Sequence, residues 1–271
     1  MIFKVASLQM AHSDAQSKAE RIVHAEEMID KVANVDLILL SETWNVGWFS
    51  FDEYNALSEP IDGETISRIA AKAKEVNSYI LAGSIIEKDK DGHLYNTSVL
   101  LDPNGKRIAT YRKMHLVGFT VSGTIMGVGG EKAILKPGKE IVVAKTDLGV
   151  LGLSICYDIR FPELFRKMAV HHGVEVFLHP SGWPISKVDN YQALIKARAN
   201  ENMCWMVTCV GAGVNRGNQY QGYSAVVDPD GNVLSCGPRA AEAIVLGEVD
   251  ISRVYALRKA ITVFDDMALP V

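Results

Sequence analysis

Apolar positions along the chain follow two periodicities in turn, and this order predicts strands that alternate with helices. Mostly apolar runs at residues 2–10, 37–40 and 79–86 are typical of buried strands. Between these runs, apolar residues recur at the three- and four-residue spacing of amphipathic helices. One helix carries Ile22, Ala25, Ile29 and Val32 on a single face, and the next carries Ile66, Ile69, Ala70, Ala73 and Val76. Ser13 and Gln16 fit a capping box that opens the first helix.

The first half ends with a further strand, expected at residues 97–101. The second half repeats the order of elements, with strands expected at residues 149–157 and 174–179 and helices at residues 162–172 and 188–202. A segment that begins at Ser78 also aligns without gaps on one that begins at Cys204, at a constant offset of 126 residues.

Both segments contain a hairpin turn between apolar runs, Asp102-Pro103-Asn104-Gly105 and Asp228-Pro229-Asp230-Gly231. Two hairpins can converge on similar turns, but the shared order of elements favours a duplication. Two such halves can stack their sheets and cover each outer face with helices. The pattern therefore predicts an α/β fold, a four-layer αββα sandwich with internal pseudo-two-fold symmetry, in one domain over residues 1–271.

Composition narrows the range of partners and compartments. The 28 basic and 32 acidic residues give a net charge of -4, without the basic excess that nucleic acid requires. No apolar run approaches the roughly 20 residues that span a bilayer, and no secretion signal is visible. Four cysteines without C-x-x-C pairing are typical of a reducing compartment. We therefore expect a cytoplasmic protein that binds neither nucleic acid nor membrane.

Three polar residues stand at the ends of predicted strands, where α/β sheets place their ligand sites. Cys156 closes an apolar strand just before a helix that opens with Pro162, which is typical of a nucleophile elbow. Glu42 directly follows the strand at 37–40, and Lys113 ends another. Each has an ordinary alternative: a buried thiol, a loop carboxylate and a surface lysine. Only the combination favours nucleophilic catalysis.

The combination resembles a known family. Ser41-Glu42, Tyr111-Arg112-Lys113-Met114-His115-Leu116 and Cys156-Tyr157-Asp158-Ile159-Arg160-Phe161-Pro162-Glu163 are similar to the Glu, Lys and Cys motifs of the nitrilase superfamily of carbon-nitrogen hydrolases. The likeness extends over the chain through Glu131, His179-Pro180-Ser181-Gly182-Trp183-Pro184, Arg198-Ala199-Asn200-Glu201-Asn202 and Val227-Asp228-Pro229-Asp230-Gly231. The chain departs from the family at Ser41, where proline is common, and over residues 117–130, which are expected to border the substrate pocket.

The resemblance implies the same αββα sandwich and a set of roles. Cys156 would attack the substrate, Glu42 would act as general base, and Glu131 would hold Lys113 and the substrate in register. Lys113 and the backbone N–H of Tyr157 would bind the oxyanion. A cationic lysine is also expected to favour the thiolate of Cys156.

Substrate and assembly follow from the same resemblance. The motif after Cys156 is more similar to amidases, including the ω-amidase branch, than to enzymes acting on nitriles. A nitrilase or N-carbamoyl hydrolase would use the same three residues, and a catalytically silent scaffold would have no reason to keep them. Trp44, Trp48 and Trp183 follow strand ends and could line the pocket for a small linear amide, with Trp44 and Trp183 as the main candidates, although such aromatics more often pack in a core. Neither a metal nor a cofactor is expected. The resemblance also implies a homodimer or larger homo-oligomer, with a C-terminal tail, residues 251–271, that reaches the partner subunit.

Overall fold

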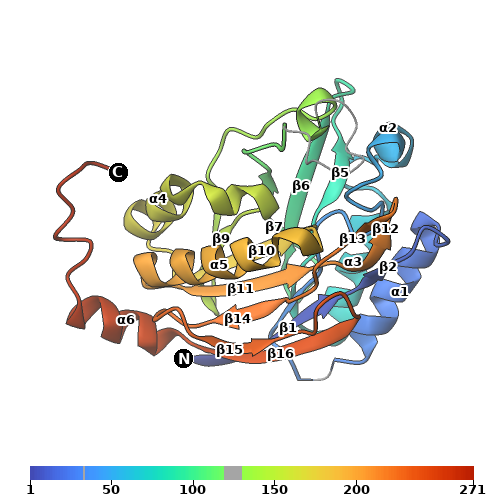
Figure 1. Cartoon of the computed structure of the whole chain (residues 1–271). Helices are drawn as coiled ribbons and strands as arrows, with labels where there is room; N and C mark the ends of the chain where they lie inside the picture. Colours follow the sequence, from blue (N-terminus) through green and yellow to red (C-terminus); the bar gives the residue numbers. More distant parts are fainter. Residues whose placement is uncertain (33, 119–129) are drawn as a thin grey trace.

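The computed structural model describes residues 1–32, 34–118 and 130–271, and its elements follow the predicted order (Figure 1). The first half holds β1 (Ile2–Gln9), β2 (Ala11–His12), α1 (Lys18–Asp30), β3 (Leu37–Leu39), η1 (Phe51–Glu53), α2 (Tyr54–Leu57), α3 (Glu64–Val76), β4 (Tyr79–Leu81), β5 (Ile85–Lys88), β6 (Leu94–Leu101) and β7 (Arg107–Arg112). After it come η2 (Gly130–Ala133), β8 (Val143–Thr146), β9 (Gly149–Leu153), η3 (Cys156–Arg160), α4 (Pro162–His172), β10 (Val176–Ser181), η4 (Ile185–Lys187), α5 (Val188–Asn202), β11 (Trp205–Val210), β12 (Ala212–Asn215), β13 (Asn218–Gln219), β14 (Ala225–Val227), β15 (Val233–Cys236), β16 (Ala243–Asp250) and α6 (Ile251–Ala260).

Two large sheets have the same internal order, which confirms the pseudo-two-fold symmetry. One sheet follows the path β16-β1-β3-β4-β6-β7, and the other follows β8-β9-β10-β11-β14-β15. In both paths the first pair is antiparallel, the next two pairs are parallel, and the last two are antiparallel. β5 adds a further strand beside β6 in the first sheet.

The two predicted hairpin turns make the same hydrogen bonds. In the β6–β7 turn, the N–H of Gly105 donates to the carbonyl of Asp102, and the Asp102 carboxylate accepts from the N–H of Lys106. In the β14–β15 turn, Gly231 and Asn232 donate to Asp228 in the same way. Gly105 and Gly231 have φ angles of 75° and 84°, the left-handed conformation that glycine adopts without strain.

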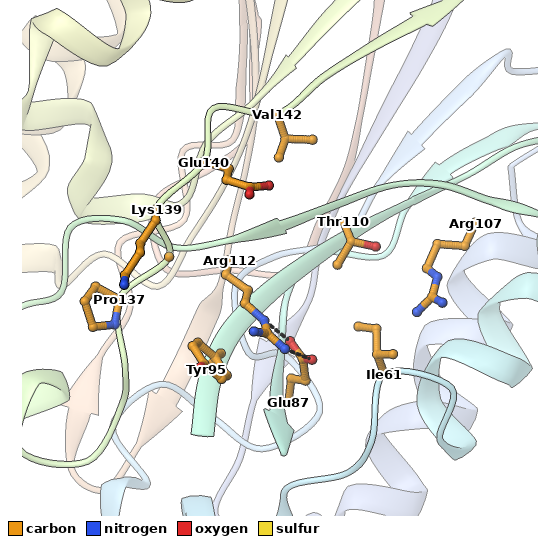
Figure 2. Close-up of a pocket in the computed structure, with 11 residues that line it drawn as sticks. Ile61, Glu87, Tyr95, Arg107, Thr110, Arg112, Pro137, Lys139, Glu140 and Val142 are labelled. Atoms are coloured by element: carbon orange, nitrogen blue, oxygen red, sulfur yellow. Dashed lines mark hydrogen bonds and ion pairs between the residues drawn. The ribbon is translucent and has the colours of Figure 1, made fainter. Parts of the chain in front are cut away.

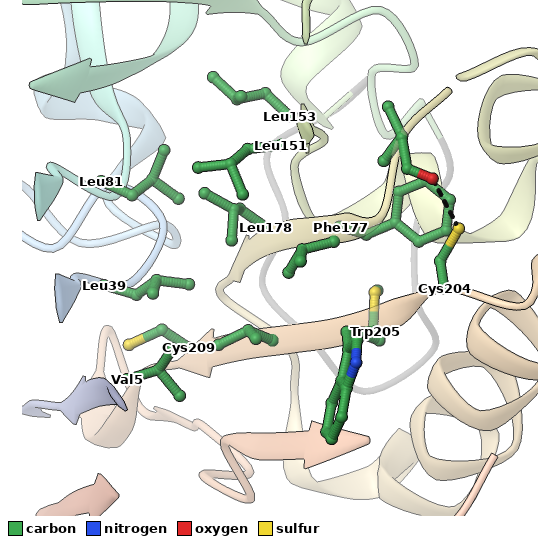
Figure 3. Packing of buried hydrophobic residues seen from close by; sticks show 14 of the residues in the cluster. Val5, Leu39, Leu81, Leu151, Leu153, Phe177, Leu178, Cys204, Trp205 and Cys209 are labelled. Carbon is green, nitrogen blue, oxygen red and sulfur yellow. Dashed lines mark hydrogen bonds between the residues drawn. The ribbon is translucent and has the colours of Figure 1, made fainter. Parts of the chain in front are cut away.

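Side chains along each strand alternate between two cores, and this alternation builds the four layers. In β1, Val5 packs between the sheets, while Leu8 faces the helices α1 and α3. In β3, Leu39 packs between the sheets and Ile38 faces the helices. Figure 3 shows the inter-sheet cluster, where Val5, Leu39 and Leu81 of one sheet meet residues of the other, among them Leu151, Leu153, Leu178 and Cys209. The helices α4 and α5 cover the far face of the second sheet.

Local predictions needed three corrections. The capping box of α1 is formed by Ser17 and Glu20, not by Ser13 and Gln16, so the helix begins at Lys18. The strand expected over residues 79–86 is divided into β4 and β5 at Gly83, whose φ is 61°. The strand expected over 149–157 ends at Leu153, because the chain turns there into the 3-10 helix η3.

Of the stretch from 117 to 130, residues 119–129 lie outside the described residues. All four cysteines are free thiols: Cys156, Cys204 and Cys209 are buried and Cys236 is exposed. In the described part of the chain, no helix combines the length and the apolar character that crossing a membrane requires.

Candidate active site

Cys156 lies at a sharp elbow between β9 and α4. It opens η3 with a φ angle of 47°, a left-handed conformation that costs a non-glycine residue strain and is typical of functional turns. The side chain is 3% exposed, so the thiol faces the interior of the molecule. Tyr157, whose backbone N–H was predicted as an oxyanion donor, is the next residue in the same turn.

Glu42 follows β3 and is fully buried, and both of its carboxylate oxygens accept hydrogen bonds. The N–H of Gly182, which follows β10 in the other sheet, donates to Oε2 at 2.7 Å. Asn96 Nδ2 and Lys113 Nζ each lie 2.8 Å from Oε1. A β-carbon at Gly182 would lie 3.2 Å from Oε2 and 2.8 Å from Cβ of Trp48, so only glycine fits closely beside this carboxylate.

Lys113 lies directly after β7 and is surrounded by carboxylate oxygens. Its Nζ is 2.8 Å from Glu42 Oε1, and 2.9 and 2.8 Å from Oε1 and Oε2 of Glu131. An ammonium group has three N–H donors, so these contacts use its full capacity. Burial lowers the pKa of Lys113, but the charges of Glu131 and Glu42 outweigh it and raise that pKa above its usual value. The lysine is therefore a fixed positive charge.

Glu131 is held in place from four directions. Besides Lys113, its carboxylate accepts from Trp48 Nε1 at 3.1 Å, from Asn96 Nδ2 at 3.2 Å and from the N–H of Val117 at 2.9 Å. The side chain is fully buried in η2. Glu42, Lys113, Glu131 and Cys156 thus form a buried tetrad.

The environment of Cys156 favours its protonated thiol over the thiolate. Burial raises the pKa of the Cys156 thiol well above its usual value, and the negative charge of Glu42 adds to this effect. Lys113 lowers the thiol pKa, as the sequence suggested, but burial and the charge of Glu42 each have a larger effect in the opposite direction. Burial also raises the pKa of Glu42, against the opposing charge of Lys113. The Glu42 carboxylate also forms a hydrogen bond with the Cys156 thiol, so the two groups are direct neighbours.

This arrangement agrees with comparisons to known proteins. A family model described as carbon-nitrogen hydrolase matches residues 4–259. The chain belongs to the carbon-nitrogen hydrolase family. It is 34% identical over 250 residues to the 2-oxoglutaramate amidase of Bacillus subtilis, covering 92% of each chain. It is 32% identical to human Omega-amidase NIT2, covering 97% of this chain and 94% of that one.

Solved structures of the same superfamily share the fold of this hydrolase. The crystal structure of Saccharomyces cerevisiae Nit3, a member of branch 10 of the nitrilase superfamily, superposes with a TM-score of 0.85 at 26% identity, covering 96% of this chain and 94% of that one. The carbon-nitrogen hydrolase superfamily protein from Xanthomonas campestris, with an arsenic adduct in its active site, has a TM-score of 0.88 at 23% identity, with 100% and 99% coverage. These likenesses confirm the αββα sandwich.

Sequence reasoning missed a buried brace that ties the lysine segment to the cysteine elbow. The Asp158 carboxylate accepts from Tyr111 OH at 2.7 Å, from the Ile155 N–H at 2.9 Å and from the His115 N–H at 3.1 Å. His115 Nδ1 lies 2.7 Å from the same carboxylate, and its ring stacks on Phe161. Lys113 stands between Tyr111 and His115, so this brace sets the position of the lysine relative to Cys156.

The tryptophans predicted to bind substrate lie in different surroundings. Trp44 is fully buried in the cluster between α1, α3 and their sheet, and its Nε1 donates to the carbonyl of Ala82, so its role is in the core. Trp48 contacts the tetrad through a hydrogen bond to Glu131. Trp183 follows Gly182, packs 5.1 Å from the Tyr191 ring and lies 5.0 Å from the guanidinium of Arg160. Its contact with substrate remains a prediction.

Cavities and donor clusters elsewhere in the described chain are built from residues outside the tetrad. Asp89, Asp91 and His93 bring possible metal ligands together in an exposed turn, where Asp89 already accepts from the backbone N–H groups of Asp91 and His93. A cavity of about 610 Å³ near the β6–β7 hairpin contains the ion pair of Arg112 with Glu87 (Figure 2), and no tetrad side chain lines it. A cavity of about 490 Å³ beside Tyr157 and His115 lies nearer the site.

Proposed function

We propose that this carbon-nitrogen hydrolase converts a small linear amide to a carboxylic acid and ammonia through a thioester on Cys156. The observation that carries the proposal is the buried tetrad, in which a neutral thiol lies beside a carboxylate of raised pKa and a fixed ammonium. These are the nucleophile, base and electrostatic stabiliser that acyl transfer requires. The similarity to proteins named 2-oxoglutaramate amidase and Omega-amidase NIT2 supports an amide as substrate.

The proposed first step forms the thioester. Cys156 Sγ bonds to the amide carbon while its proton passes to Glu42. The carbonyl oxygen becomes an oxyanion that accepts from Lys113 Nζ and the Tyr157 N–H. Since Glu131 occupies two of the three lysine donors, one of these bonds can transfer to the oxyanion while the other keeps Lys113 in place. The carbon-nitrogen bond then breaks, and Glu42 returns the proton to the departing ammonia.

The second step reverses the roles. A water molecule gives a proton to Glu42 and attacks the thioester carbon, and the same donors hold the second oxyanion. The carbon-sulfur bond breaks, the acid leaves, and the proton on Glu42 returns to the Cys156 sulfur. In each step Glu42 accepts one proton and then returns one, and a carboxyl group whose pKa lies above its usual value is suited to this exchange.

We further propose that the substrate carries a carboxylate at its other end, as in the monoamide of a dicarboxylic acid. Arg160 ends the same 3-10 turn that Cys156 opens, and its guanidinium lies 5.0 Å from the Trp183 ring and 5.8 Å from the Tyr157 ring. Among the described residues, no acidic group pairs with Arg160. A half-buried cation on an aromatic platform is suited to bind a carboxylate.

The Arg160→Gln variant tests this substrate class. The KM for succinamate should rise about 10- to 100-fold, since a hydrogen bond to a charged group is worth about 1.5–3 kcal/mol. The KM for butyramide, which lacks the carboxylate, should change less than about twofold. Arg239→Gln, an exposed change on another loop, serves as the matched control. Equal effects on the two substrates would assign Arg160 a general packing role instead.

The reaction type is tested by product analysis on the wild type and Cys156→Ala. Amides should release ammonia, and the variant should release none. Ammonia and acid from nitriles alone would identify a nitrilase, and carbon dioxide in addition would identify an N-carbamoyl hydrolase. Absence of turnover on all three classes would favour the silent scaffold, which is disfavoured because it has no reason to retain the whole tetrad.

We also propose a cytoplasmic homodimer or larger homo-oligomer. Four free thiols support a reducing compartment. The C-terminal tail exposes Tyr255, Ile261 and Leu269 at 61%, 47% and 81%, as expected of a segment that meets a partner subunit. Light scattering of the full chain and of a chain ending at residue 260 distinguishes these states: the proposal requires a multimer whose mass falls on truncation.

A further inference from the structure

Asn96 lies at the centre of the tetrad, although it belongs to no motif that the sequence singled out. It is fully buried in β6, and its Nδ2 donates to Oε1 of both Glu42 and Glu131, at 2.8 and 3.2 Å. A carboxamide nitrogen has two hydrogens, so both are used on the two carboxylates. The backbone carbonyl of Asn96 accepts from the N–H of Lys113 at 2.8 Å. One residue therefore contacts three members of the tetrad.

We propose that Asn96 is a positioning residue, which holds Glu42 and Glu131 at a fixed separation around Lys113 and keeps Glu42 directed at the Cys156 thiol. The inference rests on the proposed function for its kinetic consequences. Its geometry is independent of any substrate, because every partner of Asn96 is a side chain or backbone group of the resting protein.

The electrostatics explain why a neutral donor is needed between the carboxylates. Two carboxylates converge on one ammonium, so the buried group carries an excess negative charge if both are ionised. The charge of Glu131 contributes to the raised pKa of Glu42. A hydrogen bond donated to the ionised form opposes that effect without adding a charge. Without Asn96, Lys113 would be the one donor to Oε1 of Glu42 left among the described residues.

Other titratable groups around Glu42 do not supply a substitute. Burial raises the pKa of Tyr54 and of Tyr220, so neither phenol ionises near neutral pH. Among the described residues, the groups that shift the pKa of Glu42 by charge or side-chain hydrogen bond are therefore Lys113, Glu131 and Cys156. A change at Asn96 should act through this set and alter when Glu42 accepts a proton.

The test measures how fast chloroacetamide alkylates Cys156 as a function of pH. This rate depends on removal of the thiol proton and does not require the natural substrate. A Cys236→Ser background removes the exposed thiol, and peptide mass mapping locates the adduct. Asn96→Ala removes both donors, and Asn96→Ser keeps one hydroxyl. Ser98→Ala is the matched control, because Ser98 is buried on the same face of β6 and its hydroxyl has no partner among the described residues.

In Asn96→Ala, the acid limb of the alkylation profile should move to higher pH by about one unit, because the ionised Glu42 has lost a donor. The kcat for amides, counted per reactive thiol, should fall about 10- to 100-fold with KM changed less than about threefold. Asn96→Ser should be intermediate, and Ser98→Ala should match the wild type.

An unshifted acid limb in a folded Asn96 variant would overturn the inference. If Asn96→Ala does not fold, as circular dichroism would show, Asn96→Ser decides the question alone. Failure of the proposed function is distinguishable: the wild type would then release no ammonia from any amide, while the alkylation profiles would still report the effect of Asn96.

Discussion

At the scale of single residues, a fully buried lysine between two buried carboxylates is a costly arrangement. Taking such charges out of water costs several kcal/mol per ion, which their attraction offsets only when every donor and acceptor is paired. Here Lys113 uses all three donors, and Glu131 accepts additional bonds from Trp48, Asn96 and Val117. Strain and charge gathered in this way are typical of a site selected for function.

Lys113→Met should therefore affect both stability and turnover. The variant leaves two buried carboxylates without their cation, which should lower the free energy of unfolding by about 3 kcal/mol. Loss of the oxyanion donor should lower kcat about 100- to 1000-fold. Urea unfolding and amide turnover measure the two effects, with the exposed Lys136→Met as control. A kcat within tenfold of the wild type would contradict the role given to Lys113.

The sequence could reveal the site residues that stand at strand ends, but not those that lie within a strand. Glu42, Lys113 and Cys156 stand at strand ends, so a periodicity argument places them together at one edge of the sheets. Asn96 lies within β6 in the segment Leu94–Leu101, which reads as an ordinary strand. Its partners Glu42 and Glu131 are 54 and 35 residues away, and no local pattern encodes such contacts. The position of Trp48 after a strand marked it as a candidate, but its hydrogen bond to Glu131, 83 residues away, could not be read from the sequence.

At the scale of elements, the site is assembled by segments that follow strands of both sheets. Glu42 comes after β3, Gly182 adjoins the end of β10, and Cys156 comes after β9. Because the sheets are stacked, the Gly182 N–H of one sheet can donate to the Glu42 carboxylate of the other. The brace centred on Asp158 then joins the segment after β7 to η3.

Asp158→Asn should weaken this junction. The carboxylate accepts from four donors, whereas an asparagine offers one acceptor oxygen and turns an N–H₂ group toward the remaining donors. We expect the free energy of unfolding to fall by about 2–3 kcal/mol, together with a loss of kcat, because the lysine and the elbow separate.

The milder Tyr111→Phe change removes a single donor and should cost about 1 kcal/mol. Urea midpoints and turnover of both variants provide the measurement. If Asp158→Asn proved no worse than Tyr111→Phe, the brace would not be the element that positions Lys113.

At the scale of the whole molecule, the duplicated architecture was predictable because both halves keep the same turns and the same order of periodicities. The helices at residues 162–172 and 188–202 begin and end as predicted. The start of α1 was placed wrongly because two Ser-x-x-Glu/Gln patterns lie close together, and only tertiary packing selects Ser17. The break of residues 79–86 into two strands also depends on long-range contact, since Gly83 lies against the backbone of Ser41.

The stability of the whole molecule should decrease in acid because two histidines are buried in the neutral form. Burial lowers the pKa of His12 and of His179 from 6.5 to about 3. The unfolded chain binds these protons below pH 6.5 and the folded chain does not, so stability present above about pH 6.5 is lost as pH falls toward about 3. Each histidine contributes a slope of about 1.4 kcal/mol per pH unit in this window.

His12→Phe should lower the slope of the unfolding free energy against pH by the contribution of one histidine, about 1.4 kcal/mol per pH unit. The His12 ring lies 4.6 Å from the Tyr220 ring in a tilted arrangement, and neither of its nitrogens has a hydrogen-bond partner among the described residues, so phenylalanine can take its place. Urea unfolding at several values between pH 4 and 6 gives the slope directly. An unchanged slope would mean that His12 keeps its proton in the folded protein.

The measurement that tests the central claim most directly is a search for the acyl-enzyme. The wild type and Cys156→Ala are mixed with a small amide, quenched in acid within milliseconds to seconds, and digested for mass analysis. The account predicts an acyl group on the peptide that contains Cys156 in the wild type, together with ammonia release, and neither in the variant. Ammonia release without an adduct on this peptide, or release that persists in Cys156→Ala, would contradict the assignment of Cys156 as the nucleophile.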